Sequence, residues 1–451
     1  MIEGMTESQL TLHIIKQLKE GKKNHFQKTI DELQPYDIAK IYSSIPAKHR
    51  TRFLLFINVE QIADLIQELE KDLQFEALTK LGIEKSGQVM DLMDNDDLAS
   101  LLEHLSKDKM EELLSGMKKE ESKIVQDIMN YPPETAGRLM TNRFVWIKDH
   151  YTIRETVEKL KTFAEYSETI NYLYVIDQNK HLVGVVSYRD IILANENEKI
   201  QDIMYSRVIS VTADTDQEEV ARLIERYDFL AIPVVDNGVL VGIVTVDDII
   251  DVVISEATED IEKLSASGKA IDFDTKAYVA AYRRLPWLIL LLFIGIVSGT
   301  IISQFEETLS TVVALAFFMP MIAGMTGNTG TQSLAVVVRG LITREVDRKT
   351  AAQLIFRELK VGLIIGFICG ILIALIALVW QGSAVLGLVV GSSLIMTLVI
   401  GTLAGTIIPL ILYRLNVDPA IASGPLITTL NDIVSLFIYF GMATLFINQL
   451  M

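Results

Sequence analysis

The sequence predicts a multidomain membrane protein with four parts: an all-α helical-repeat N domain, an α/β pair of duplicated units, a connecting helix and a five-helix α transmembrane domain. Three observations predict this fold class. Long apolar stretches occur in the last third of the 451-residue chain, a strand-rich pattern occurs twice in the middle, and the first part has apolar residues at helical spacing. We expect the parts at residues 1–131, 138–255, 256–280 and 281–451.

The first part is expected to be helical throughout. A short pattern recurs at irregular spacing in residues 37–41 (DIAKI), 61–65 (QIADL) and 97–101 (DLASL). Stacked helix pairs are the natural packing for such repeats. Two prolines and a glycine in residues 131–137 then interrupt the helical pattern and mark a boundary.

The second part is duplicated, with units at about 138–200 and 201–255. Each unit contains an apolar strand, a turn, a second strand and a helix, and Asp236-Asn237-Gly238 suits a hairpin. An aspartate stands at the same place in both units, as Asp190 and Asp248. Helix capping alone is one explanation for this pair of aspartates.

Acidic residues are concentrated in the first three parts. Residues 285–451 carry seven acids and seven bases, so the whole formal net charge of −17 resides in residues 1–284. Such a region does not suit nucleic-acid binding, and keeping a large soluble region dispersed is the simplest explanation. The connecting helix combines a dense acidic run with apolar residues, and oxygen-only acidic clusters suit hard cations such as Mg²⁺ or Ca²⁺.

Five apolar stretches are long enough to cross a membrane, because about 20 helical residues span the hydrocarbon core. They lie at residues 285–302, 308–338, 361–380, 385–412 and 421–447. The second is expected to be a broken helix, because Pro320 and a glycine-rich run interrupt it. Irregular backbone there would line a pore.

Lys and Arg in the short loops predict the orientation of these spans. The loops on one side carry Arg283, Arg284, Arg339, Arg344, Arg348, Lys349, Arg357, Lys360 and Arg414, and the opposite loops carry neither residue type. We therefore expect cytoplasmic N-terminal domains, an outside C-terminus, and a location in the plasma (cytoplasmic) membrane without a signal peptide. The only cysteine is Cys369, so no disulfide is expected within one chain.

One carboxylate, Asp432, stands inside the last apolar stretch. A charge at that depth costs roughly 2.5 to 3.5 kcal/mol, so such a residue usually faces a cavity, an ion path or a partner. A cation pathway is the leading interpretation. An intramembrane aspartyl enzyme would need a second carboxylate from a partner chain, and the sequence contains no Walker A, His-Glu-x-x-His or nucleophile-elbow motif. We do not expect an enzyme.

The chain resembles the MgtE family of magnesium transporters and channels, and residues 138–255 resemble a tandem CBS pair. Residues 320–332 (PMIAGMTGNTGTQ) and 418–432 carry the family motifs. The resemblance implies that residues 256–280 form a plug helix and that a homodimer encloses the pore, with Asp432 of each chain facing Mg²⁺. CBS pairs often bind adenine nucleotides such as ATP, which the resemblance places at Asp190 and Arg189.

The expected pore residues are Asp432, Asn328, Gly327, Thr331 and Thr428. Mg²⁺ gives up its waters reluctantly, so carboxylates, amides and carbonyls would hold the hydrated ion. Asn328 and Thr331 could instead only satisfy a kinked helix. Gly424 stands where family members can carry a polar side chain, so one pore contact is expected to be absent.

We hypothesise that Mg²⁺ is both substrate and regulator: it enters down its electrochemical gradient, and intracellular Mg²⁺ shuts the pore by bridging acids. The expected regulatory ligands are Asp91, Gly137, Asp216, Glu218, Asp228, Asp248, Asp251, Glu256, Glu259, Asp260 and Asp418. When Mg²⁺ falls, the carboxylates repel one another and the domains separate. The alternative is a nucleotide-gated transporter of another divalent cation such as Co²⁺.

Overall fold

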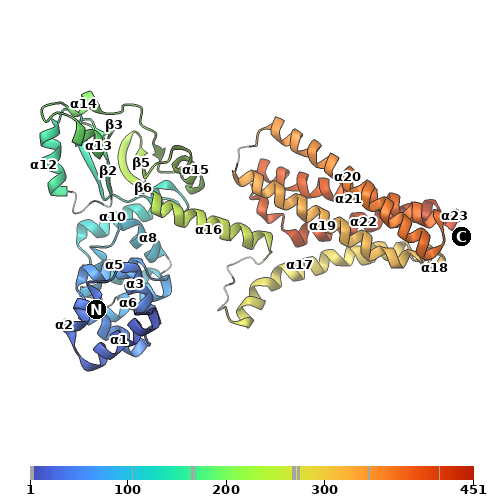
Figure 1. Cartoon of the computed structure of the whole chain (residues 1–451), viewed down its shortest axis with the longest axis horizontal. Coiled ribbons are helices and arrows are strands. Elements are labelled where there is room, and N and C mark those ends of the chain that lie inside the picture. The colour runs from blue at the N-terminus through green and yellow to red at the C-terminus, as the bar shows by residue number, and fades with distance from the viewer. Residues whose placement is uncertain are drawn as a thin grey trace. The chain divides into compact units, whose positions relative to one another are not determined.

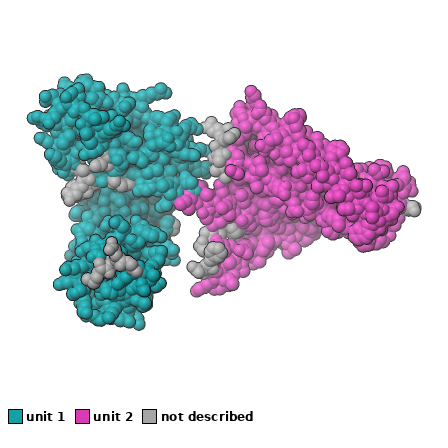
Figure 2. All heavy atoms as spheres, in the orientation of Figure 1, with its two compact units in different colours: residues 1–253 teal, residues 254–451 magenta. Residues whose placement is uncertain are grey.

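The computed structural model describes residues 5–103, 105–163, 167, 169–266, 271, 275–343, 346–415 and 417–450. The chain forms two compact units, residues 1–253 and 254–451 (Figure 2). Arg344, one of the loop residues used to predict orientation, lies outside the described residues, as do residues 267–270 and 272–274 of the predicted plug segment.

The described part of the N domain is helical, as predicted. Its helices are α1 (Glu7–Glu20), α2 (Lys23–Ile30), α3 (Pro35–Ser44), α4 (Ala47–Phe56), α5 (Val59–Gln67), α6 (Lys71–Leu81), α7 (Ile83–Met90), α8 (Asn95–Glu103), α9 (Lys107–Leu114) and α10 (Lys119–Met129). The short sequence repeat falls in α3, α5 and α8. In each copy the second, third and fifth residues are buried, so the repeat marks the core-facing side of three helices.

The duplicated units each fold around a three-stranded sheet. After α11 (Ala136–Leu139), the first unit contains β1 (Phe144–Lys148), α12 (Ile153–Phe163), β2 (Thr169–Ile176), β3 (Leu182–Ser187) and α13 (Tyr188–Leu193). The second contains α14 (Ile200–Ile203), β4 (Val211–Thr212), α15 (Gln217–Tyr227), β5 (Ala231–Asp236), β6 (Val239–Thr245) and α16 (Val246–Leu264). In both sheets the first strand is parallel to the second, and the second is antiparallel to the third (Figure 1).

The duplication extends to the way the two units exchange segments. Thr141, ahead of the first sheet, pairs with Ile243 in β6, and Tyr205, ahead of the second sheet, pairs with Val185 in β3. Asn237 and its following glycine have φ values of 50° and 81°, which the predicted tight hairpin turn requires.

The second unit contains five long helices, α17 (Ala277–Gln304), α19 (Leu315–Thr343), α20 (Arg348–Gln381), α21 (Ala384–Arg414) and α22 (Gly424–Leu445), with the short α18 (Glu306–Thr311), η2 (Pro419–Ile421) and α23 (Ile447–Leu450). These five helices overlap the five predicted spans. By length and composition, α17, α20, α21 and α22 can cross a membrane. Residues 324–332 put nine mostly polar or small residues into the middle of α19, which lowers its hydropathy.

Small residues let the membrane helices approach one another closely. Gly362, Gly366 and Gly370 form a stripe on α20, and a Cβ on any of them would lie within 3.3 Å of an atom of α21. Such close backbone packing is typical of membrane helices, where apolar burial from water does not drive association. None of the residues of α17, all of which the structure describes, is buried.

Candidate ion pathway and regulatory residues

The prediction of a broken second span is wrong. Helix α19 is continuous, so Gly327 and Asn328 have helical backbone, and Thr331 Oγ1 donates to both of their carbonyl oxygens (3.1 and 2.9 Å). A Cβ on Gly327 would lie 2.7 Å from Cγ2 of Thr428. The glycine therefore permits close contact with α22, which offsets its cost of up to about 1 kcal/mol in a helix.

Asp432 lies one helical turn after Thr428, so the two side chains share a face of α22. Both are half-buried. The neighbouring face of α22 packs into the unit through buried residues, namely Ile427, Asn431, Ser435 and Tyr439. The Thr428–Asp432 face thus borders the packed interior and stays partly open in a single chain.

The five predicted pore residues lie on adjoining faces of two packed helices. Contact between Thr428 and Gly327 places the Thr428–Asp432 face of α22 next to the face of α19 that carries Gly327 and Thr331. Asn328 is exposed and Thr331 is half-buried. Carboxylate, amide and hydroxyl oxygens of this kind suit the water shell of a small, hard cation.

Asn431 is a residue of this region that sequence reasoning missed. It is 2% exposed, and its Nδ2 donates to the backbone oxygen of Thr326 in α19 (3.4 Å). The same Nδ2 lies 2.1 Å from the place that a Cβ on Gly330 would take, and 3.6 Å from that of Gly401 in α21. The sequence did contain a feature that could have identified it: Asn431 is the one asparagine in the last apolar stretch, and it directly precedes Asp432.

At the end of α16, two predicted regulatory carboxylates meet a lysine that the sequence analysis did not single out. Lys263 Nζ lies 2.6 Å from Glu259 Oε1 and 2.6 Å from Asp418 Oδ2. Burial opposes the charge of Lys263, but the two carboxylates outweigh it and raise the pKa of the ammonium group. Burial, and then the charge of Asp418, raise the pKa of Asp260.

The hydrophobic contact next to this ion pair holds the end of α16 in the second unit. Leu264 packs against a buried cluster that includes Ala420, Ala422 and Ile427, which belong to η2, the loop after it and α22. The paired charges and the apolar contact together attach the end of α16 beside the start of α22. Helix α16 includes only residues 256–264 of the predicted plug helix at 256–280, and α17 begins at Ala277.

A second acidic region lies within the first compact unit, residues 1–253, where α8 carries Asp97. Burial raises the pKa of Asp97 to about 6, and the charges of Asp94, Asp251 and Asp247 add to the shift, while a hydrogen bond from Gln67 opposes it. Of these acids, only Asp251 was a predicted regulatory ligand. The others were missed because sequence separation hides that α8 and α16 bring their carboxylates together.

Arg143 ties the Asp91 loop of the N domain to the first duplicated unit. Its guanidinium donates to the backbone oxygens of Leu92 (2.9 Å) and Asp91 (3.3 Å) and pairs with Asp94 (3.3 Å). Asp91 Oδ1 accepts a hydrogen bond from the backbone nitrogen of Lys118 (3.0 Å). The predicted ligand Asp91 therefore has a structural role as well.

Several other predicted regulatory residues also have local roles. Asp216 is the N-cap of α15 and accepts a hydrogen bond from the Glu218 backbone nitrogen (2.8 Å), and Asp228 ends that helix with φ 53°. A Cβ on Gly137 would lie 2.6 Å from the ring of Tyr131. Within the described residues, no three carboxylate, imidazole or thiolate groups lie together as a metal centre. The regulatory sites, Glu256 included, stay predictions.

The aspartates of the duplicated pattern both bond to the hydroxyl residue three positions earlier. The backbone nitrogens of Asp190 and Ser187 donate to each other's side chains and form a capping box at the start of α13, where Ser187 Oγ also donates to Asp190 (2.6 Å). Thr245 Oγ1 donates to Asp248 at the start of α16. Helix capping thus accounts for Asp190 by itself, and the bond to Thr245 gives Asp248 a local role. A nucleotide contact would be an additional role.

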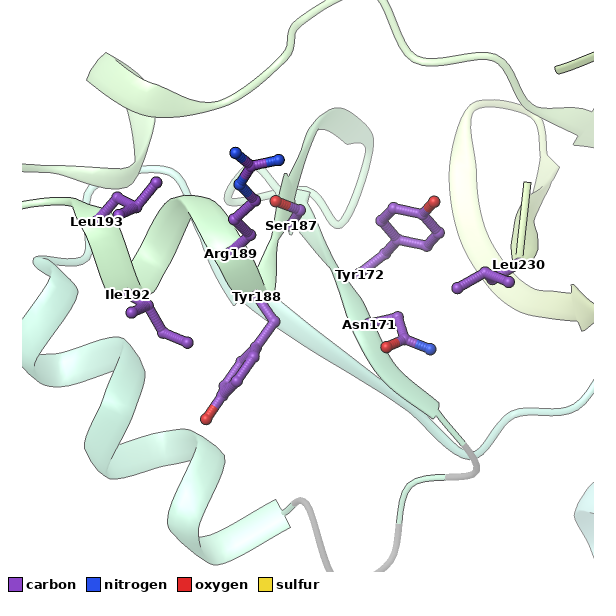
Figure 3. Close-up of a pocket in the computed structure, with 8 residues that line it drawn as sticks. All are labelled: Asn171, Tyr172, Ser187, Tyr188, Arg189, Ile192, Leu193 and Leu230. Carbon is purple, nitrogen blue, oxygen red and sulfur yellow. The ribbon is translucent and has the colours of Figure 1, made fainter. Parts of the chain in front are cut away.

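Two cavities open beside β2. The larger, about 490 Å³, is lined by Asn171, Tyr172, Ser187, Tyr188, Arg189, Ile192, Leu193 and Leu230. Figure 3 shows Arg189 and Tyr188 on opposite sides of the start of α13, with Tyr172 and Leu230 further along. Predicted residue Arg189 lines this cavity, whereas Asp190 does not belong to its lining.

The second cavity, about 260 Å³, combines aromatic rings with an arginine. Its lining includes Tyr172, Tyr205, Arg207 and Phe229, together with residues of β2, β3 and β5. Aromatic faces can stack on a planar base, and a guanidinium can pair with phosphate. Sequence reasoning missed these four residues because they come from segments that only the folded pair of sheets brings together.

Family models match the chain in the order that the fold suggests. The MgtE intracellular N domain matches residues 33–134, the CBS domain matches residues 136–197 and 200–255, and the MgtE divalent cation transporter matches residues 319–442. Magnesium transporter MgtE of Bacillus subtilis (strain 168) is 63% identical over 100% of both chains. The protein of the same name from Thermus thermophilus is 36% identical over 98% of this chain and 99% of its own.

Solved structures resemble the soluble part. The crystal structure of the soluble part of a magnesium transporter has 36% identity and a TM-score of 0.54, covering 56% of this chain and 100% of that one. The cytosolic domain of the Mg²⁺ channel MgtE in complex with ATP has 32% identity and a TM-score of 0.52, covering 54% and 99%.

The fold and the site therefore define a membrane protein in which a helical domain and a CBS pair precede a bundle of apolar helices, the last of which, α22, carries the carboxylate Asp432. The full-length identity identifies the particular branch of such proteins. The chain belongs to the MgtE family.

Proposed function

We propose that this chain imports Mg²⁺ down its electrochemical gradient along a pathway at Asp432, and that intracellular Mg²⁺ closes the pathway. The placement of Asp432 carries the proposal: an intramembrane carboxylate lies on a half-open face, one turn from Thr428 and beside Gly327 of α19. Full-length identity of 63% with a magnesium transporter supports Mg²⁺ as the cargo. Asn328 and Thr331 would then bind the water shell of the ion.

The pore would form between two copies of the chain in the plasma membrane. A single copy leaves the Asp432 face partly open, and α17 exposes large apolar side chains such as Leu292 and Phe293 to lipid or to a partner. In the soluble unit, Ile192 is 64% exposed and Leu193 73% exposed on α13. Apolar surfaces of this kind are typical of subunit interfaces. The loop charges support cytoplasmic N-terminal domains and an outside C-terminus.

Closure by Mg²⁺ would use the acids of residues 1–131, of the CBS pair at 138–255, of the plug helix at 256–280 and of the pore domain at 281–451. Bound ions would neutralise carboxylates that otherwise repel one another, and the closed arrangement would gain the free energy of binding. The charges of Asp94, Asp251 and Asp247, which add to the raised pKa of Asp97, support this valve.

An adenine nucleotide is the second proposed ligand. The ATP complex of the related cytosolic domain supports it. So does the lining of the two cavities, each of which contains an arginine, Arg189 or Arg207, together with aromatic side chains. In this proposal the nucleotide adjusts the soluble domains, and Mg²⁺ is the cargo. Nucleotide-controlled flux of Co²⁺ with no Mg²⁺ flux would instead favour the alternative cation.

The test is uptake of Mg²⁺ into proteoliposomes by the wild type, Asp432→Asn and a matched control, Glu307→Gln. Glu307 is an exposed carboxylate outside the Asp432 face. We expect Asp432→Asn to abolish most uptake while Glu307→Gln keeps it. Equal uptake by all three proteins would move the pathway away from Asp432.

A further inference from the structure

The side chain next to Asp432 occupies a slot built from three helices. Asn431 of α22 is 2% exposed, and its Nδ2 lies within 2.1 Å of a Cβ position on Gly330 and 3.6 Å of one on Gly401. Any larger residue at position 330 would overlap the carboxamide. The two glycines therefore leave a space that the Asn431 side chain fills.

The walls of this slot are fixed by backbone contact. A Cβ on Gly405 of α21 would lie 2.1 Å from the carbonyl oxygen of Gly330, so α19 and α21 touch at the same level. Asn431 also donates to the Thr326 oxygen in α19 (3.4 Å). Since a buried amide needs a partner, this bond and the slot select one rotation of α22.

Among the described residues, the other side-chain hydrogen bonds from α22 to neighbouring helices lie at its far end. Tyr439 OH donates to the Leu315 oxygen (2.9 Å), and the hydroxyl groups of Thr444 and Thr308 are 2.9 Å apart. These contacts lie two turns or more beyond Asp432. Close to Asp432, α22 packs on α19 through Ile427 and Thr428, and Asn431 adds the hydrogen bond that favours one rotation of the helix.

We infer that Asn431 is a positioning residue for ion selection: the carboxamide, locked between Gly330 and Gly401, fixes the direction of Asp432. The inference rests on the proposed role of Asp432 in the pathway. It also explains why a glycine stands at position 330 of a continuous helix: any side chain there would overlap Asn431. A hydrated ion is recognised by groups at defined separations, so a small rotation of α22 changes which ion fits.

The experiment compares uptake of Mg²⁺ and Ca²⁺ by the full-length protein in proteoliposomes. We expect Asn431→Ala to lower the Mg²⁺-to-Ca²⁺ uptake ratio by about tenfold, within the range that an ångström-scale misplacement produces. Gly330→Ala should lower Mg²⁺ uptake, because the new Cβ overlaps Asn431. The double variant should recover the uptake of Asn431→Ala alone, because the overlap is gone.

The matched control is Thr444→Val, which removes another interhelical contact of α22 but lies far from Asp432. It should lower thermal stability in detergent without moving the ratio. An unchanged ratio in Asn431→Ala, or a double variant as impaired as the product of the single ones, would overturn the inference. If Asn431→Ala does not fold, Asn431→Ser is used, and an unchanged ratio in that variant has the same meaning.

Asp432→Asn in the same assay separates this inference from the proposed function. If Asp432→Asn keeps wild-type uptake, the proposed pathway fails, and the positioning role fails with it. If Asp432→Asn abolishes uptake while the Asn431 variants keep the wild-type ratio, only the positioning role is wrong.

Discussion

At the scale of single residues, Asp97 shows how burial changes the chemistry of a carboxylate. Its pKa is raised from 3.8 to about 6, first by burial and then by neighbouring acids. Between these two values the folded unit holds a proton that the unfolded chain releases. The contribution of Asp97 to the free energy of unfolding is therefore fully present below about pH 3.8, and it is lost as the pH rises through about 6.

Asp97→Asn should remove this penalty. We expect the local stability of α8 at pH 7.5 to rise by about 1–2 kcal/mol, and its pH dependence between about 4 and 6.5 to flatten. Hydrogen exchange of α8 amides in the full-length protein measures this. The control is Asp108→Asn, an exposed carboxylate on α9. A variant with the same pH slope as the wild type would contradict the raised pKa.

Lys263 is the second residue whose charge has a measurable consequence. Its ammonium group lies between Glu259 and Asp418, two of the hypothesised Mg²⁺ ligands. In Lys263→Met these carboxylates lose a competing cation. The free Mg²⁺ needed to close the pathway should then fall roughly fivefold, as about 1 kcal/mol of partly exposed ion pairing implies.

Uptake measured against free Mg²⁺ on the soluble-domain side gives the closing midpoint of Lys263→Met. Lys22→Met is the control, since Lys22 pairs with Glu20 on the surface of the N domain. An unchanged or higher midpoint in Lys263→Met would show that the ammonium group does not compete with Mg²⁺.

At the scale of elements, α19 is held to α22 by its glycines. Gly327→Ala places a Cβ 2.7 Å from Thr428 Cγ2 and should lower stability by about 1–3 kcal/mol through overpacking. Adding Thr428→Ser removes Cγ2 and should restore the lost stability. At Gly324 a Cβ meets nothing within 4 Å in this chain, so Gly324→Ala should be neutral or stabilising.

Thermal unfolding in detergent, followed by the loss of monodisperse protein, compares these α19 variants. Gly327→Ala as stable as Gly324→Ala would contradict the packing role of the glycine. So would a Thr428→Ser/Gly327→Ala protein that is no more stable than Gly327→Ala.

The elements also show what the sequence could predict. Periodicity and duplication predicted the helical N domain, two of the three strands in each duplicated unit and the five long membrane helices, because each of these patterns is local. The broken helix was wrong, since glycine and proline in a membrane helix have two physical meanings, backbone breaks and close packing. Only the partner surfaces on α21 and α22 distinguish them.

Some residues of the candidate site could also be predicted from the sequence, and others could not. Asp432 was identifiable because a lone carboxylate in an apolar stretch is rare. Asn431 and Lys263 were missed because their importance comes from what they touch, Gly330 and Gly401 for one and Asp418 for the other. Those partners lie far away in the sequence.

At the scale of the whole molecule, the acidic soluble domains should respond to Mg²⁺ even without transport. We expect millimolar Mg²⁺ to protect the soluble region and the plug segment from protease relative to chelator, because bound ions remove repulsion between carboxylates. The control is an equal ionic strength of NaCl. Cleavage at the same rate in Mg²⁺ and in chelator would contradict the proposed closure by Mg²⁺.

The most direct measurement of the central claim is initial Mg²⁺ uptake into proteoliposomes, with free Mg²⁺ on the soluble-domain side held at micromolar or at millimolar levels, for the wild type and Asp432→Asn. The account predicts rapid uptake by the wild type at micromolar Mg²⁺, little at millimolar Mg²⁺, and little by Asp432→Asn at either level. Rapid uptake by Asp432→Asn at micromolar Mg²⁺ would contradict it.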